Sequence, residues 1–183
     1  IFTTCPETVY GITFMVMAPE HKLLDELKDK ITNYEEIIDY KVKTSYRSEF
    51  DRISDQKEKT GCLVDGIYAI NPVNQKKVPI YIADFVLANY GTGMVMAVPT
   101  HDQRDYDFAK KFGLEIIQVL DGGDISQKAF TEDGVHINSD FLNGLNKQDA
   151  INKMLEWLEK NGCGQKTTTY KLRNWVFARQ RYW

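Results

Sequence analysis

The sequence predicts an α+β domain, in which short strands form a sheet and helices pack around it. Two local patterns carry this prediction. Apolar residues recur at helical spacing in some segments, and in others runs of β-branched residues end at glycine or proline. In addition, 43% of the 183 residues are hydrophobic and 12% are aromatic, which is enough to bury one sizeable core. We therefore expect a single globular domain.

Charge and cysteine content exclude several classes of protein. The formal net charge of −3 argues against a surface that coats nucleic acid, but it leaves room for recognition of a small terminal piece of one. Cys5, Cys62 and Cys163 are odd in number and lack CxxC spacing, so we expect reduced thiols and neither a disulfide nor a zinc site. No run approaches the roughly 18 apolar residues of a membrane span. We expect a soluble protein of an interior compartment.

Strands and helices alternate in the first third of the chain. We predict a strand at 1–4, a turn at 5–8, a strand at 12–17, a helix at 19–31, a helix at 34–53 and a charged loop at 54–61. The first helix is indicated by Leu23, Leu27 and Ile31, whose spacing places them on one face.

Later segments are predicted to be strands followed by one long helix. The expected elements are strands at 62–64, 67–70, 78–82 and 114–120, a surface segment at 130–141 and a helix at 147–160. Asp65 and Gly66 suit a turn between the first two of these strands. Asn146 suits the cap at the start of the long helix, and Gly162 suits its end.

The centre of the chain, residues 91–105 (GTGMVMAVPTHDQRD), brings a tight turn, a strand and a charged cluster together. Gly91 and Gly93 suit the turn, and 94–98 is apolar enough for a buried strand. Pro99 ends that strand because proline cannot donate to a sheet ladder. The polar run that follows precedes a predicted helix at 106–112, which ends at Gly113. We expect a functional site between the strand end and the helix start.

Three segments together resemble the editing insertion, connective polypeptide 1 (CP1), of bacterial-type leucyl-tRNA synthetases. They are GTGMVMAVPTHDQRDYDFA, TTCPET and LRNWVFARQRYW. The resemblance covers essentially the whole chain. It implies one editing domain over 1–183, excised from a larger class I synthetase, with 171–183 starting the return segment to the catalytic core. The start without methionine and the abrupt end also predict an excised piece. The implied fold is a small β-barrel-like mixed sheet wrapped by helices.

The activity that the resemblance implies is post-transfer editing. Such a domain hydrolyses the ester that joins norvaline, isoleucine or methionine to tRNA-Leu, and it excludes leucine. A second site is needed because one methylene in an apolar pocket discriminates by only about 1–3 kcal/mol. The HIGH-type and KMSKS-type signatures of adenylation are absent, so we expect no amino-acid activation by this chain.

The resemblance also implies the surroundings of the domain. Expected partners are the 3'-terminal aminoacyl-adenosine of tRNA-Leu and the remainder of the synthetase, in a monomer. No cofactor is expected for editing, whereas the parent synthetase would use ATP and Mg. The expected location is the bacterial cytoplasm or an organelle.

Asp105, Thr3 and Thr4 are the predicted catalytic residues. The matching aspartate of the family holds the α-ammonium of the substrate, a task for which a carboxylate forms a charge-assisted hydrogen bond. Thr3 and Thr4 match threonines that position water or the developing oxyanion. From the residues alone, Asp105 is equally suited to cap the helix that follows, and the threonines are equally suited to a strand.

Six further residues are predicted to bind substrate. Thr8 matches the steric gate that collides with the branched γ-carbon of leucine, and four others match pocket-lining positions: Tyr90, Met96, Val98 and His101. Asp102 is expected either to contact the substrate or to support the loop. Core packing is the alternative for Val98. Arg104 is expected to form a structural ion pair. We expect neither a His101-Asp102 dyad, for want of a marked nucleophile, nor a metal site.

Two positions depart from the family pattern. Cys5 stands where the family usually has arginine, and Glu7 where it has aspartate. The loss of that arginine removes a cation near the substrate or a local salt bridge. Two rival interpretations therefore stay open: an editing-inactive module that binds the tRNA acceptor end, and a scaffold between synthetase domains.

Overall fold

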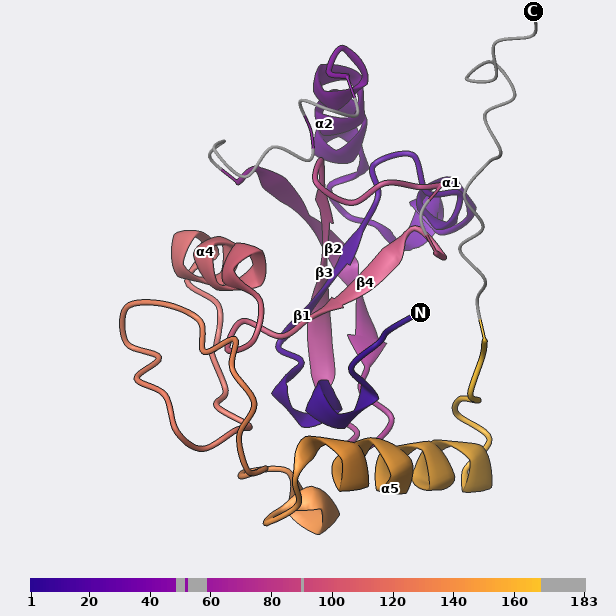
Figure 1. The fold of residues 1–183 in the computed structure, drawn as a ribbon. Helices are drawn as coiled ribbons and strands as arrows, with labels where there is room; N and C mark the ends of the chain where they lie inside the picture. Colours follow the sequence, from indigo (N-terminus) through magenta and orange to yellow (C-terminus); the bar gives the residue numbers. More distant parts are fainter. Residues whose placement is uncertain (49–51, 53–58, 90, 169–183) are drawn as a thin grey trace, which may run out of the picture.

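The protein folds around a four-stranded mixed sheet with helices on both faces (Figure 1). The structure, a computed structural model, describes residues 1–48, 52, 59–89 and 91–168. The strands are β1 (Phe14–Met17), β2 (Gly61–Ile70), β3 (Lys77–Ala83) and β4 (Met94–Ala97). The α-helices are α1 (Leu23–Glu26), α2 (Tyr34–Ser45), α4 (Gln103–Phe112) and α5 (Lys147–Lys160). Short 3-10 helices are η1 (Pro6–Gly11), η2 (Lys28–Lys30) and η3 (Asp140–Leu142).

The order of the strands in the sheet is β2-β3-β1-β4. β1 runs parallel to β3, and the other two pairs are antiparallel. The predicted α+β class with a mixed sheet and surrounding helices is confirmed. Within the described residues, however, the sheet is open and does not close into a barrel, because four strands are too few to circle an interior filled by side chains.

The two faces of the sheet have different compositions, because successive side chains of a strand point to opposite sides. On the aromatic face, Phe14 and Val16 pack against Phe108 of α4, and the rings of Phe14 and Phe108 stack at 5.1 Å. On the other face, Met15 and Met17 belong to a separate core. We call this second side, which also carries Met94 and Met96, the methionine face. Residues of α1, α2, η1 and α5 contribute to its core.

The predicted hairpin turn at Asp65 and Gly66 is wrong. β2 is one continuous strand, and both of its halves pair with β3, with a register shift between Leu63 and Tyr68. Gly66 has φ +93°, and a Cβ there would lie 2.2 Å from the backbone oxygen of Lys30. The Asp-Gly pair therefore forms an irregularity inside a strand that passes close to another backbone.

Two predicted strands are also absent from the described residues. The segments 1–4 and 114–120 have the composition of strands but are irregular, apart from an isolated bridge between Leu120 and His136. β-branched composition is not sufficient, because a strand also needs a partner with a free edge. The predicted turn at 5–8 is the start of η1.

Capping residues predicted the helix boundaries better than apolar spacing did. α5 matches its prediction, with the Asn146 side chain accepting from the N–H of Asp149 and Gly162 at φ +64°. In contrast, the helix predicted at 19–31 divides into α1 and η2, and α2 ends at Ser45 instead of continuing to 53. Of that expected continuation, 49–51 and 53 lie outside the described residues.

Candidate functional site

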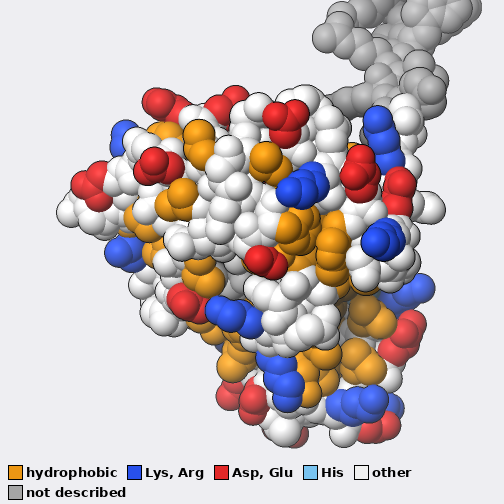
Figure 2. Space-filling model, turned by 90° about the horizontal axis from the view of Figure 1, so that it is seen from below, with side chains coloured by type: hydrophobic (Ala, Val, Ile, Leu, Met, Phe, Trp, Pro, Cys, Tyr) orange, Lys and Arg blue, Asp and Glu red, His pale blue; other side chains and the backbone are white. Residues whose placement is uncertain are grey.

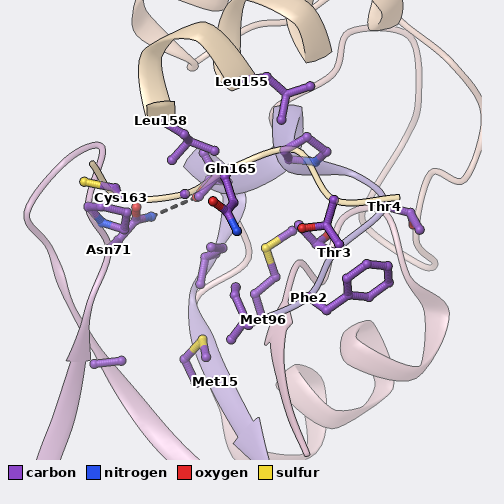
Figure 3. Close-up of a pocket in the computed structure, with 18 of the residues that line it drawn as sticks. Phe2, Thr3, Thr4, Met15, Asn71, Met96, Leu155, Leu158, Cys163 and Gln165 are labelled. Carbon is purple, nitrogen blue, oxygen red and sulfur yellow. Dashed lines mark hydrogen bonds between the residues drawn. The ribbon is translucent and has the colours of Figure 1, made fainter. Parts of the chain in front are cut away.

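A pocket of about 450 Å³ opens on the methionine face of the sheet, next to α5 (Figure 3). Ligand pockets commonly measure roughly 300–1,000 Å³. Segments that are distant in sequence form its walls: Phe2, Thr3 and Thr4 near the N-terminus; Met15, Val78 and Met96 in the sheet; Ile151, Leu155 and Leu158 on α5; and 163–167 after α5. Most of these side chains are apolar, and the threonine hydroxyls are among the few polar groups.

The end of β2 fixes the pocket wall formed by η1. Asn71 is buried, and its Nδ2 donates to the backbone oxygen of Val9 at 2.8 Å (Figure 3). Its Oδ1 accepts from the N–H of Val73. One side chain thus ties η1 to the turn that follows β2.

The threonine corner, which consists of Thr3, Thr4 and Thr8 around Pro6, is held by local hydrogen bonds. The N–H of Cys5 donates to Thr3 Oγ1 at 3.1 Å, and the hydroxyl of Thr8 donates to the oxygen of Cys5 at 3.0 Å. Thr3 accepts in this arrangement, so its own O–H remains available to a ligand. Thr8 is buried and does not belong to the pocket lining.

Glu7, the other departure from the family pattern, is buried inside this corner. Its Oε2 has no hydrogen-bond partner within the described residues, and burial raises the pKa of its carboxyl, against the lowering effect of the Lys147 charge. Cys5 is a free, half-buried thiol, and Thr4 Oγ1 lies 3.7 Å from its Sγ.

Asp105 lies in the first turn of α4, where it supports the end of β4. Its Oδ2 accepts from the N–H of Val98 at 2.9 Å, and the residue is 8% exposed. Burial, followed by the nearby Asp102 carboxylate, raises the pKa of Asp105 to about 7. Its other oxygen, Oδ1, accepts no hydrogen bond from the described part of the chain. Asp105 does not line the pocket.

The capping role considered for Asp105 belongs to Asp102. α4 begins at Gln103, one turn earlier than predicted, and the Asp102 side chain accepts from the N–H of Arg104. Arg104 also forms the expected ion pair with Asp102, at 2.8 Å. Burial raises the pKa of Asp102, but the hydrogen bonds and charge of Arg104 outweigh it and hold that pKa below its usual value.

His101 is engaged with a loop. Its Nδ1 lies 2.8 Å from the backbone oxygen of Phe130, so Nδ1 carries the proton and donates. Burial lowers the pKa of His101, and its Nε2 is buried with no partner in the described residues. Across those residues, no group of three or more His, Cys, Asp and Glu side chains could hold a metal ion.

Comparison with known proteins identifies the family. The family described as "Leucyl-tRNA synthetase, editing domain" matches residues 1–159. The chain belongs to this family. Among solved structures, it is similar to a leucyl-tRNA synthetase (LeuRS) of Agrobacterium radiobacter K84 in a ternary complex with tRNA and LeuAMS, at 33% identity and a TM-score of 0.68. The match covers 95% of this chain and 18% of that one.

Family membership supports an editing role for this domain, and the structure divides the predicted site residues into two groups. Thr3, Thr4 and Met96 line one pocket. Those that do not line it are Thr8, Val98, His101, Asp102 and Asp105, and Tyr90 lies outside the described residues. Asp105 does not reach the pocket because α4, which carries it, packs on the aromatic face, whereas the pocket opens on the methionine face. Val98 is buried in the core of the methionine face without lining the pocket.

Sequence reasoning about the editing domain missed several pocket residues. Ile151, Leu155 and Leu158 share one face of α5 at helical spacing, which signals burial but does not reveal that they border a pocket. Met15 faces Met96 across the β1–β4 pair, a relation that follows only from the pairing register.

The surface of the editing domain shows no broad field of one charge on the side that carries α5. Figure 2 shows Lys and Arg side chains interspersed with Asp and Glu there, with hydrophobic side chains visible between them. Within the described residues, no helix has the length and apolar character needed to cross a bilayer.

Proposed function

We propose that this domain performs post-transfer editing within a leucine–tRNA ligase. It hydrolyses the ester bond between norvaline, isoleucine or methionine and the terminal adenosine of tRNA-Leu, and it spares leucine. The observation that carries the proposal is the family match over 1–159, combined with a pocket of about 450 Å³ whose lining includes Thr3, Thr4 and Met96. The expected partners are tRNA-Leu and the rest of the synthetase.

The proposed reaction is attack of water on the ester carbonyl carbon. The carbon–oxygen bond to the ribose breaks, the ribose recovers its hydroxyl, and the amino acid leaves as a carboxylate. The hydroxyls of Thr3 and Thr4 are suited to stabilise the oxyanion, because donors aimed at developing charge lower the barrier. Thr3 already accepts from Cys5 N–H, which orients its oxygen and leaves its proton for this purpose. We assign no protein general base and no cofactor to the step.

Asp105 is proposed to bind the α-ammonium of the substrate. Its Oδ2 is engaged by Val98, so Oδ1 is the oxygen that would accept from the ammonium. With a pKa of about 7, the carboxyl is only partly ionised at neutral pH, and an approaching cation favours the ionised form. Because Asp105 does not line the pocket, the ammonium would lie outside it, next to the end of β4.

A binding module without hydrolytic activity is the second candidate. It is favoured by the positions of Asp105 and Thr8 outside the pocket lining and by Cys5 in place of the usual arginine. In that case the pocket would hold the acceptor end of tRNA, and no ester would be cleaved.

Deacylation of isoleucyl-tRNA-Leu, measured with the native chain and with Asp105→Ala and Asp105→Asn, tests the proposal. We expect the native chain to be active and both variants to lose about 10–100-fold, the value of a hydrogen bond to a charged group. Binding of a non-hydrolysable norvalyl-adenosine amide is measured in parallel. A native chain that binds the amide but cleaves no ester is a binding module. A chain that does neither supports the scaffold interpretation.

A further inference from the structure

The methionines of this chain are concentrated in one place. The sequence contains five, and all of them belong to or pack against the core of the methionine face. They come from two strands and one helix: Met15 and Met17 on β1, Met94 and Met96 on β4, and Met154 on α5.

Two of these methionines form the part of the pocket that belongs to β1 and β4. Met15 and Met96 are Cα partners in the antiparallel β1–β4 pair, and both line the pocket (Figure 3). Directly opposite residues have Cβ atoms roughly 4.5–5.5 Å apart, so the two thioethers are neighbours. Met17 and Met94 repeat the same pairing two residues further along, but they do not line the pocket.

The methionine pair is more adaptable than the β-branched residues of the lining. Ile12, Val78 and Ile151 also line the pocket, and their β-branched side chains are restricted at χ1. Methionine is unbranched, has three rotatable bonds and carries a polarisable sulfur, so it fits surfaces of different shapes. A ligand that varies in length or branching is therefore accommodated at Met15 and Met96.

We propose that Met15 is a specificity-determining residue, which together with Met96 forms a deformable floor for aliphatic side chains of different shapes. This inference rests on the proposed editing function. It gives a physical reason why one pocket would accept norvaline, isoleucine and methionine: the floor changes its rotamers to suit each side chain, while the β-branched residues of the lining keep theirs.

The variant Met15→Ile tests this role, because it nearly conserves volume and removes the rotational freedom. The measurement is kcat/KM for deacylation of norvalyl-, isoleucyl- and methionyl-tRNA-Leu. We expect the methionyl ester, which has the longest side chain, to lose about tenfold relative to the norvalyl ester. Met17→Ile is the matched control, since Met17 lies on the same strand and face but outside the lining. It should change all three rates by a common factor.

A second readout does not depend on catalysis. In a chain labelled at the methionine methyl groups, a norvalyl-adenosine or methionyl-adenosine amide should shift the resonances of Met15 and Met96 and leave that of Met17 in place. If the native chain cleaves the esters but Met15→Ile preserves their relative rates, the role of Met15 is refuted and editing stands. If no ester is cleaved, editing falls, and the methyl shifts still decide whether Met15 contacts the ligand. Silent methyl groups at saturation would refute the contact.

Discussion

The pocket has room but few charged groups, whereas the strand–helix junction, residues 98–105, gathers charged side chains that are already engaged with one another or with the backbone. The pocket is bordered mostly by apolar side chains, and Thr3 and Thr4 are among its few polar residues. At the junction, Asp102 caps α4 and pairs with Arg104, and Asp105 supports Val98. Each charged group there already has a structural task. The proposed reaction needs the space of the pocket and the charge of the junction. Variants in each region should therefore have separate effects on stability and on activity.

Replacement of Asp105 by asparagine should have the largest effect on stability. Burial raises the pKa of Asp105 from 3.8 to about 7, so between these values the folded chain binds more protons than the unfolded chain, and stability falls as pH rises. Asparagine stays neutral and still accepts from Val98 N–H. We therefore expect Asp105→Asn to stabilise the chain at pH 8 by at most roughly 4 kcal/mol, even though deacylation is lost.

Urea unfolding of both proteins at pH 8 and pH 4 checks this prediction. The stability difference should shrink toward pH 4, where the native carboxyl is protonated in the folded state. If the stability difference between the native chain and Asp105→Asn is the same at both pH values, ionisation of Asp105 does not destabilise the folded chain. The contrast between a charged junction and a mostly apolar pocket would then have no energetic consequence.

The variant Thr8→Ala tests whether the threonine corner excludes leucine. If its bulk is the gate, leucyl-tRNA-Leu should be hydrolysed about tenfold faster, the effect of one methyl-sized contact. Thr44→Ala is the matched control, because both hydroxyls donate to the carbonyl three residues earlier at 3.0 Å, and both residues are buried. Equal behaviour of the two variants would remove Thr8 from the specificity machinery.

Loss of the Asp102 cap of α4 should change the stability of the chain less than replacement of Asp105 does. Asp102→Ala removes the acceptor for Arg104 N–H and the ion pair, and we expect a loss of about 1 kcal/mol in the free energy of unfolding. Asp102→Ser retains a capping oxygen and should recover most of that loss. If serine is as damaging as alanine, the ion pair and not the cap stabilises the junction.

The smallest expected effect concerns His101. Burial lowers the pKa of His101 below 6.5, so its contribution to stability is complete above pH 6.5 and is lost as pH falls through the folded-state pKa. His101→Asn removes this pH-dependent contribution to stability, because asparagine does not titrate. Unfolding at pH 7 and pH 5 should show that the native chain loses more stability on acidification than the variant does. An identical loss in both would place the acid sensitivity elsewhere.

Much of the fold follows from local signals in the sequence. The bounds of α5 follow from Asn146, the apolar spacing and Gly162, and the end of α4 follows from Gly113, which has φ +65°. β1, β3 and β4 lie where β-branched and apolar runs predicted them. The motifs that indicated the editing family are also local, and the family match confirms it. Local chemistry decides these features because caps and spacing act within a few residues.

Tertiary structure alone decided which predicted site residues meet. Met96 and Asp105 are close in sequence, but the sheet places the pocket on the methionine face, and α4 packs on the aromatic face. The pairing of β1 with β4 brings Met15 beside Met96, although they are distant along the chain. Only the packed sheet sets these relations, because a strand's two faces become different environments once its neighbours and covering helices are in place.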